Sequence, residues 1–387
     1  MTIPKITGVE LAGDASKPLL VVGPSLGAAV TALWSGAATV LGEHFHVVGW
    51  DLPGHGSTPA GDAFTMKDLA AGVLAFVDGA RRARDDQRPF AYAGVSAGGA
   101  IGLQMMLDAP TEIRAAALLC TGAQIGTADG WHERAATVRA SGTPSMVTGS
   151  VQRWFAPGFL QRDPATSSAL LESLQHADAE GYAQVCEALA DFDVRDRLAD
   201  ITTPVLAVAG AQDDPTPPAS LQAIAAGVAE GRVVILDDVA HLAPAEAPDR
   251  VARLLRDHLL PSPTMREVYD AGMMVRREVL GDAHVDRATA TTTPFTEDFQ
   301  ELITQYAWGT IWTRPGLDRR SRSMITLTAL IARGHHEELA MHVRAAVNNG
   351  LTADEIKEVI LQSAIYTGVP DANTAFQIAH DTLANRH

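Results

Sequence analysis

Cysteine, positive charge and long apolar runs are all scarce in this chain of 387 residues. Its two cysteines, Cys120 and Cys186, are too few and too far apart for a disulfide framework or a cysteine-based metal site, so we expect them to pack as apolar side chains. No run of about 18 apolar residues occurs, and the segment from Met1 to Lys5 lacks the apolar core of a secretion signal. The sequence therefore predicts a cytoplasmic protein without a membrane partner.

Acidic residues outnumber basic ones: 46 Asp and Glu stand against 30 Lys and Arg, which gives a net charge of −16. This charge argues against a nucleic-acid partner, and no Lys/Arg cluster near the ends suggests an anchor on an acidic membrane. We expect small-molecule partners instead. If these are anionic, individual arginines must lie inside the pockets that hold them, because the overall field repels anions.

The length favours two domains. In residues 1–258, short apolar runs alternate with helical stretches, which predicts a parallel sheet of the α/β class. Residues 122–195 interrupt this alternation with helical segments, and we interpret them as a lid over the carboxyl ends of the strands. The predicted strands are Pro18–Gly23, Phe45–Asp51, Phe90–Gly94, Ala115–Cys120, Pro204–Gly210 and Val233–Leu236.

A helix expected from Pro248 to His258 closes the first domain, and residues 259–264 form a short, stiff linker. Residues 265–387 show helical patterns only, so the second domain is predicted to be all-α. Within it, Thr352 to Glu355 forms a capping box that opens a helix reaching Ala364, and Asn349-Gly350 ends the preceding helix.

The most complete chemical motif is the segment from Gly94 to Gly98, which has the pattern Gly-x-Ser-x-Gly around Ser96. It follows a predicted strand and precedes a helical run at 100–106. Glycines in this context allow a tight strand-turn-helix that exposes the serine hydroxyl as a nucleophile.

A nucleophilic serine needs a base and a group that orients the base. His241 follows the predicted strand that ends at Leu236, and we assign it as the base. Two acidic candidates, Asp213 and Asp214, follow the preceding strand. Asp213 is favoured because it stands three residues before Thr216-Pro217, and the order Ser, Asp, His is that of α/β-hydrolases.

An oxyanion hole needs backbone N–H groups directed at the developing charge. Ala97, which follows the nucleophile, supplies one such group. The loop Gly23–Gly27 should supply the other, and because Pro24 has no N–H, Leu26 is the predicted donor.

This loop, the Ser96 motif and the segment Asp51–Ser57 resemble the 3-oxoadipate enol-lactonases, α/β-hydrolases of protocatechuate degradation. The resemblance covers roughly residues 10–258 and implies hydrolysis of a small anionic lactone, with Ser25 among the substrate contacts. Many members have His-Gly in the loop, where this chain has Pro24-Ser25. His55 is interpreted as a structural turn residue, because the triad already contains a base.

Substrate choice is expected to depend on the lid. Arg134 is placed to orient the acetate arm of the lactone through a bidentate contact, although a solvated surface arginine is the alternative interpretation. Trp131 and Trp154 are predicted to form the pocket wall.

A second chemical pattern lies far downstream, in a predicted helix that begins at His335. His335, Glu338 and His342 are spaced i, i+3 and i+7, so they share one helix face. A metal site is one interpretation, but no further Cys/His cluster completes a ligand shell, and we predict no metal. A merely polar helix face is another.

The surrounding sequence resembles the 4-carboxymuconolactone decarboxylases over about residues 266–383. That family is similar to the alkylhydroperoxidase-like fold, an obligate helical oligomer whose redox members carry a Cys-x-x-Cys pair where this chain has His335 and Glu338. Without thiols, disulfide chemistry is excluded and proton transfer remains. The segments that carry the resemblance are Trp308–Trp312, Arg319–Ser323, Glu338–Arg344, Asn348–Thr352 and Ile365–Pro370.

In the implied decarboxylation, loss of CO2 leaves a dienolate spread over the lactone ring, so no cofactor is required. The protein must hold two carboxylates, stabilise the developing charge and protonate the α-carbon. We assign His342 as proton donor and Glu338 as its orienting partner or relay. Arg322 and Arg344 are the candidate carboxylate or oxyanion contacts, and His335 is a secondary substrate contact.

The two resemblances support each other, because the product of the second domain is the substrate of the first. The sequence therefore predicts a fused decarboxylase and enol-lactone hydrolase that forms a homo-oligomer through its C-terminal domain. The alternative is another serine esterase, or a cofactor-free perhydrolase, whose helical domain serves only in oligomerisation. A non-enzymatic binding protein requires the ordered triad to be a coincidence.

Overall fold

The computed structural model describes residues 2–260 and 264–384, and the chain divides into two compact units, Met1–Leu260 and Pro261–His387. Part of the predicted linker, residues 261–263, lies outside the described residues. None of the helices in the described ranges is long and apolar enough to cross a membrane.

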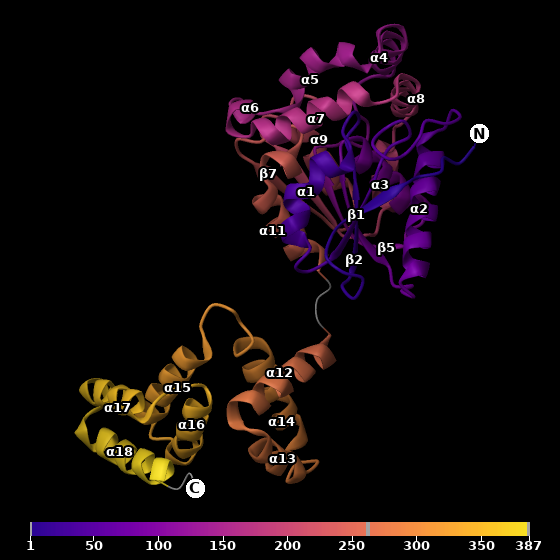
Figure 1. Cartoon of the computed structure of the whole chain (residues 1–387). Helices are drawn as coiled ribbons and strands as arrows, with labels where there is room; N and C mark the ends of the chain where they lie inside the picture. The colour runs from indigo at the N-terminus through magenta and orange to yellow at the C-terminus, as the bar shows by residue number, and fades with distance from the viewer. Residues whose placement is uncertain (1, 261–263, 385–387) are drawn as a thin grey trace. The chain divides into compact units, whose positions relative to one another are not determined.

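A sheet of seven strands forms the centre of the first unit (Figure 1). The strand order is β1-β3-β2-β4-β5-β6-β7, and all neighbours are parallel except β1 and β3. The strands β2 to β6 are almost wholly buried, which explains their continuous apolar sequences. The strands are β1 Gly8–Ala12, β2 Leu19–Gly23, β3 His46–Trp50, β4 Phe90–Val95, β5 Ile113–Leu119, β6 Val205–Gly210 and β7 Gly231–Leu236.

All six predicted strands are confirmed, and the α/β class with them. Strand β1 was missed. It pairs antiparallel at the edge of the sheet and is only half-buried, so it has neither the continuous apolar run of a central strand nor a helix leading into it.

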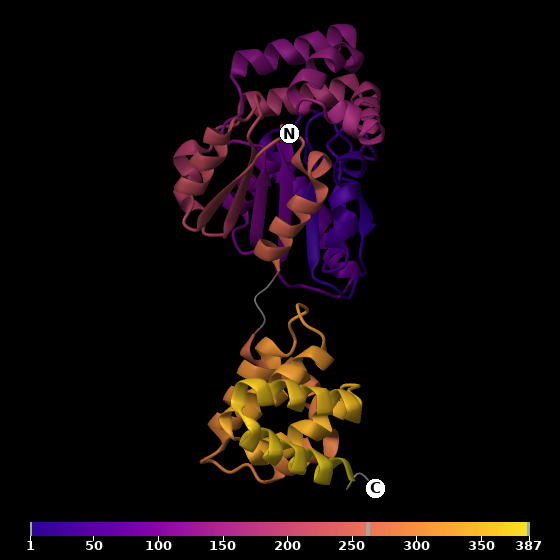
Figure 2. The same ribbon diagram turned by 90° about the vertical axis from the view of Figure 1, so that its left-hand side faces the viewer.

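Helices cover both faces of this sheet (Figures 1 and 2). Helices α1 and α11 pack against each other over one face, and α2 and α3 pack together over the other. The predicted helix from Pro248 is α11. The helices of this layer are α1 Val30–Leu41, α2 Met66–Ala83, α3 Ala97–Asp108, α9 Pro218–Gly227, α10 Ala243–Glu246 and α11 Pro248–Leu259.

A group of short helices follows β5 and lies at one end of the sheet, where Figure 1 shows it in magenta. Because β4, β5 and β6 all point their carboxyl ends toward this group, it lies over the edge at which α/β sites form. The group contains α4 Ala128–Ser141, the 3₁₀-helix η1 Thr143–Met146, α5 Val147–Trp154, α6 Phe159–Arg162, α7 Pro164–His176, α8 Ala179–Ala190 and the 3₁₀-helix η2 Arg195–Asp200.

The second unit is helical throughout its described residues, as predicted. Thr352 caps α17 through a reciprocal capping box with Glu355, and Gly350 follows the preceding helix with φ at 91°. The helices are α12 Met265–Leu280, α13 Asp282–Ala290, α14 Glu297–Ile303, the π-helix η3 Thr304–Ile311, α15 Arg319–Arg333, α16 His336–Asn348, α17 Ala353–Thr367 and α18 Val369–Ala384.

Candidate active sites

Ser96 lies at the sharp turn between β4 and α3, with φ at 53° and ψ at −115°. A residue other than glycine reaches this region only where its surroundings impose it. They do so here: a Cβ on Gly94 would lie 2.5 Å from Gly98, and one on Gly98 would lie 2.5 Å from the Pro24 carbonyl oxygen. The N–H of Gly98 donates to that same oxygen at 2.9 Å. The turn is therefore fixed by close backbone packing.

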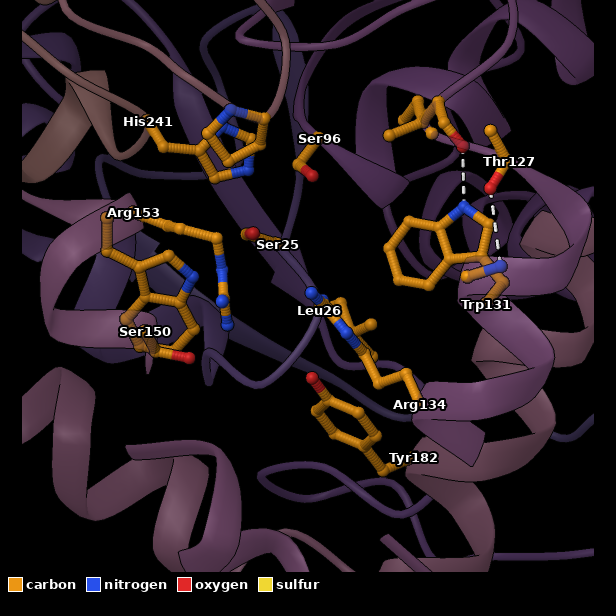
Figure 3. A pocket seen from close by; sticks show the side chains of 15 residues that line it. Ser25, Leu26, Ser96, Thr127, Trp131, Arg134, Ser150, Arg153, Tyr182 and His241 are labelled. Carbon is orange, nitrogen blue, oxygen red and sulfur yellow. Dashed lines mark hydrogen bonds between the residues drawn. The ribbon is translucent and has the colours of Figure 1, made fainter. Parts of the chain in front are cut away.

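The ring of His241 lies beside Ser96 (Figure 3) and its Nδ1 is 2.9 Å from Asp213 Oδ1. Both side chains are buried. Thr216 donates from its N–H to Asp213 Oδ1 at 3.0 Å and from its hydroxyl to Oδ2 at 2.7 Å. Asp214, the alternative acid, is exposed. The structure thus places the His241 ring beside Ser96 and joins it to Asp213 by a hydrogen bond.

Two backbone N–H groups next to Ser96 have no acceptor among the described residues, those of Leu26 and Ala97. Ala97 begins α3, and an N–H in the first helical turn has no partner within the helix. Ser25 and Leu26 border the same cavity as Ser96. The N–H groups of Leu26 and Ala97 are therefore suited to donate to an oxyanion.

A cavity of about 310 Å³ opens over the Ser96 hydroxyl, between the lid and the carboxyl ends of the strands (Figure 3). It is large enough for a small lactone. Seven of the residues expected in the hydrolase site line it: Ser25, Leu26, Ser96, Trp131, Arg134, Trp154 and His241.

Two guanidinium groups point toward the middle of this cavity, Arg134 from α4 and Arg153 from α5 (Figure 3). Arg134 stacks over Trp131 at 4.9 Å. Burial lowers the pKa of Arg153, and the positive charge of Arg134 lowers it further. In the described part of the chain neither guanidinium forms an ion pair with a carboxylate. The two like charges repel each other in a pocket that is partly shielded from water, so binding of an anion between them is favourable.

Arg153 was not among the predicted site residues. Its adjacency to Trp154, a predicted wall residue, was the available signal. Tyr182, also missed, comes from α8 and directs its hydroxyl toward the two arginines (Figure 3). Burial raises the pKa of Tyr182 to about 12, so its hydroxyl stays protonated as a hydrogen-bond donor at neutral pH.

Glu246 is a buried carboxylate beneath the His241 loop. It accepts from the N–H groups of Ala240 at 3.0 Å and Ala156 at 2.7 Å, with a longer contact of 3.4 Å to Leu242. Burial raises the pKa of Glu246, and the N–H donors oppose that shift. The carboxylate therefore joins the residues on either side of His241 to the lid segment that follows Trp154.

The second unit places His342 of α16, partly buried, near Glu338 of the same helix and His284 of α13. Burial is the largest cause that lowers the pKa of His342; the charge of His284 adds to it and that of Glu338 opposes it. The predicted pair Glu338 and His342 thus shares a local environment. His284 was not predicted, since it is distant in sequence from the motif.

His335 does not lie in the helix, and that prediction was wrong. Helix α16 begins at His336, and His335 is its exposed N-cap residue with non-helical backbone angles. The preceding Gly334 adopts a left-handed conformation that ends α15, so the chain turns at this point instead of continuing.

The two arginines expected to hold carboxylates also lie differently from expectation. The guanidinium of Arg322 donates to the backbone carbonyls of Leu317, at 3.2 Å, and Arg314, at 2.7 Å. Arg344 is exposed, although its charge influences His284. Arg322 thus stabilises the segment before α15, and part of its hydrogen-bonding capacity is used there.

Sequence families account for both units. The family described as alpha/beta hydrolase fold matches residues 18–248, and the Carboxymuconolactone decarboxylase family matches residues 297–381. The chain belongs to both families. Among the residues that the structure describes, no group of three or more His, Cys, Asp or Glu side chains is placed to hold a metal ion.

Individual relatives follow the same division. A 4-carboxymuconolactone decarboxylase from Acinetobacter baylyi is 47% identical over 115 residues, which cover 30% of this chain and 86% of that protein. The 3-oxoadipate enol-lactonase 2 of the same organism is 34% identical over 239 residues, covering 61% of this chain and 86% of that protein.

A solved structure agrees with the hydrolase assignment. The enol-lactonase from Burkholderia xenovorans LB400 superposes with a TM-score of 0.61 at 28% identity, covering 65% of this chain and 95% of that one. The hydrolase–decarboxylase fusion inferred from the motifs is confirmed at the level of families.

Proposed function

We propose that this fused hydrolase–decarboxylase converts 4-carboxymuconolactone to 3-oxoadipate and CO2, two successive steps of protocatechuate degradation. The observation that supports this most is the pairing itself: a relative of the second unit is named a 4-carboxymuconolactone decarboxylase, a relative of the first is named a 3-oxoadipate enol-lactonase, and decarboxylation of the first lactone yields the second. The tether raises the effective concentration of the hydrolase around a labile intermediate. A cytoplasmic location stays a prediction.

In the hydrolase unit, Ser96 attacks the lactone carbonyl while His241 takes its proton, and Asp213 stabilises the resulting imidazolium. The N–H groups of Leu26 and Ala97 stabilise the oxyanion. Collapse breaks the ring C–O bond, and His241 returns the proton to the enol oxygen. Water activated by His241 then hydrolyses the acyl-enzyme. The 2.9 Å contact between His241 and Asp213 supports Asp213 as the acid of the triad.

The acetate arm of the enol-lactone is bound by Arg134 and Arg153. A carboxylate between them relieves the repulsion of the two guanidinium groups, and charge-assisted hydrogen bonds fix its orientation. Trp131 and Trp154 form the walls that exclude water from the reacting carbonyl. The substrate of this unit is thus a small monoanionic lactone.

In the helical unit, departure of CO2 leaves a dienolate, and His342 donates a proton to its α-carbon. Glu338, whose negative charge favours the protonated form of His342, orients or reloads it. No cofactor takes part. The contacts of Arg322 make it a weaker candidate for substrate binding than Arg344, whose charge is free to act near His284 and His342.

A second copy of this chain covers the apolar surface of the helical unit. Large apolar side chains are exposed along α14 and η3 and again at the junction of α17 and α18, and an apolar hollow of about 740 Å³ lies between α15 and α17. Exposed patches of this extent are typical of interfaces. Sedimentation should show a homo-oligomer that Ile365→Glu with Tyr366→Glu dissociates; a monomeric parent protein would contradict this part of the proposal.

The decisive test supplies 4-carboxymuconolactone to the wild type and to Ser96→Ala and follows the products by NMR. Loss of the nucleophile should reduce hydrolysis by roughly 10⁶-fold, so the variant should accumulate the enol-lactone while the wild type forms 3-oxoadipate. Failure of both proteins to consume the compound would refute the decarboxylase assignment. Turnover of simple esters without turnover of the lactones would favour the general esterase.

A further inference from the structure

Two adjacent arginines of α12 have opposite surroundings. Arg277 is exposed and pairs with two carboxylates, Asp282 at 3.1 Å and Asp286 at 2.8 Å. Arg276 is only 6% exposed, and no carboxylate among the described residues forms an ion pair with it. A buried guanidinium without a counter-charge is costly, so its retention calls for an explanation.

Close backbone packing places Arg276. A Cβ on Gly272 of α12 would lie 2.3 Å from the Thr304 carbonyl oxygen, and one on Gly309 would lie 2.3 Å from that of Val268. Helix α12 and the π-helix η3 therefore meet along their backbones. This contact fixes Arg276, one turn after Gly272, against the start of η3.

All the hydrogen-bond partners of Arg276 in the described structure are neutral. Its Nη1 donates to the Thr304 hydroxyl at 3.1 Å and its Nη2 to Gln300 Oε1 at 3.0 Å, whereas its Nε is buried without a partner. Burial lowers the pKa of Arg276. Two hydrogen bonds thus orient the side chain, and among the described residues no carboxylate compensates its charge.

Arg276 borders a cavity of about 520 Å³ lined by α12, α13 and α14, which lie together in Figure 1, and by Thr304 of η3. Tyr269, Thr289 and Thr292 add hydroxyl groups to its lining. Two glutamates also border it, Glu297 and Glu301, but both are exposed and therefore screened by solvent. The hydroxyls of Thr289 and Thr292 donate to backbone carbonyls, so the Arg276 guanidinium is the charged donor at the buried end of the cavity.

The charge of Arg276 acts on His284, and the charge of His284 acts on His342, the proposed proton donor. After burial, the charges of Arg276, Arg287 and Arg344 are what lower the pKa of His284, and His284 in turn lowers that of His342. Positive groups from α12, α13 and α16 therefore converge on one region. A dianionic ligand bound beside Arg276 would offset part of the positive charge that acts on His284.

We propose that Arg276 binds a carboxylate of the dicarboxylate substrate in the helical unit, the role first assigned to Arg322. The second N–H groups of Nη1 and Nη2 supply the donors, and Thr304 and Gln300 hold the plane of the guanidinium. The inference rests on the proposed function for the identity of the substrate, but the anion site itself is defined by the buried charge.

Succinate, a simple dicarboxylate, is a suitable probe, titrated by calorimetry into protein carrying Arg134→Met and Arg153→Met so that the hydrolase pocket does not contribute. Adding Arg276→Met should weaken binding about 10- to 100-fold, the loss expected for a charged hydrogen-bonding partner. Arg277→Met, the matched control on the same helix, should change it by less than about twofold. Equal affinity with and without the Arg276 guanidinium would overturn the proposal.

Two further measurements keep the test decisive if Arg276→Met misfolds. The parent protein should bind succinate but not neutral succinamide, and Arg276→Lys should retain more of the affinity than Arg276→Gln. Equal binding of succinate and succinamide would overturn the proposal without any variant. Decarboxylation of 4-carboxymuconolactone is assayed on the same proteins. If succinate binds through Arg276 but the lactone is not turned over, the proposed function alone is refuted. If the Arg276 variants decarboxylate the lactone as fast as the parent protein does, this inference alone is refuted.

Discussion

The two units of this chain bury their apolar side chains to different extents. In the first unit, only Ile3 and Ile235 are exposed among the large hydrophobic residues of the described structure, whereas the second exposes more than ten, including Phe295, Ile365 and Tyr366. The first unit buries its apolar side chains within itself, because helices cover both faces of its sheet. The second has amphipathic helices that leave large apolar side chains exposed, and this surface is the one assigned to the proposed homo-oligomer.

The two sites differ in the same way. Around Ser96 the reacting groups are held by hydrogen bonds within the unit, from Asp213 through Thr216 and from the oxyanion loop through Gly98. In the helical unit, Arg276 is held by two neutral partners, Thr304 and Gln300, and no carboxylate among the described residues forms an ion pair with it. The hydrolase unit supplies its oxyanion hole and its base from its own residues. In the decarboxylase unit, by contrast, we expect the dianionic substrate to supply the counter-charge for Arg276.

The largest expected effect that separates the two sites comes from His342→Gln. Loss of the proton donor should reduce decarboxylation about 10²- to 10⁴-fold, the contribution typical of general acid catalysis, and leave hydrolysis of added enol-lactone unchanged. Separate assays with the two lactones measure this. Near-full decarboxylation by the variant would show that another group delivers the proton.

A smaller effect is expected in the hydrolase pocket. Arg153→Met and Arg134→Met should each raise KM for the enol-lactone about 10- to 100-fold, because each removes a charged partner of the carboxylate. A neutral ester of similar size is the control substrate, and its KM should change little. Equal losses on both substrates would mean that the arginines shape the pocket without binding the carboxylate.

The pH dependence should have opposite signs in the two reactions. The folded-state pKa of His342 lies below 6.5, so decarboxylation by protonated His342 should rise as pH falls from 8, by about tenfold per unit at most, until the pH passes that pKa. Hydrolysis needs neutral His241 and should fall with acidification. Parallel pH profiles of kcat/KM test this, and two profiles of the same sign would contradict the assignment of His342.

The lowered pKa of His342 also predicts an effect of acid on the stability of the helical unit. Because the folded state binds a proton at His342 more weakly than the unfolded state, lowering the pH through 6.5 should reduce the stability of the helical unit. Replacing His342 with Gln should remove that part of the pH dependence.

The smallest effect is expected from Glu246→Gln. Its amide N–H2 would face the N–H of Ala156 or Ala240 and lose a hydrogen bond, so we expect about a three- to tenfold fall in kcat for hydrolysis with KM unchanged. Glu43→Gln, at an exposed glutamate, is the control. An unchanged kcat would show that the His241 loop is positioned without Glu246.

The sequence predicted the sheet well where burial is uniform, because a strand buried on both faces must be apolar along its whole length. Strand β1 was not predicted, because a half-buried strand at the edge of the sheet need not be apolar along its whole length. In the helical unit, the spacing of His335 suggested a shared helix face, but the left-handed Gly334 ends α15 and leaves His335 as a cap. Local periodicity cannot show where one helix stops and another starts at an angle to it.

What the sequence determined by itself is the chemistry that local order encodes: the strained serine turn, the order of Ser96, Asp213 and His241, and membership of two families. Only the tertiary structure decided which charged side chains lie near one another. Arg134 and Arg153 lie on different helices of the lid, and His284 and His342 on helices far apart in the chain. Whether an arginine is solvated or buried without a counter-ion depends on packing between distant segments, and no spacing along the sequence contains that information.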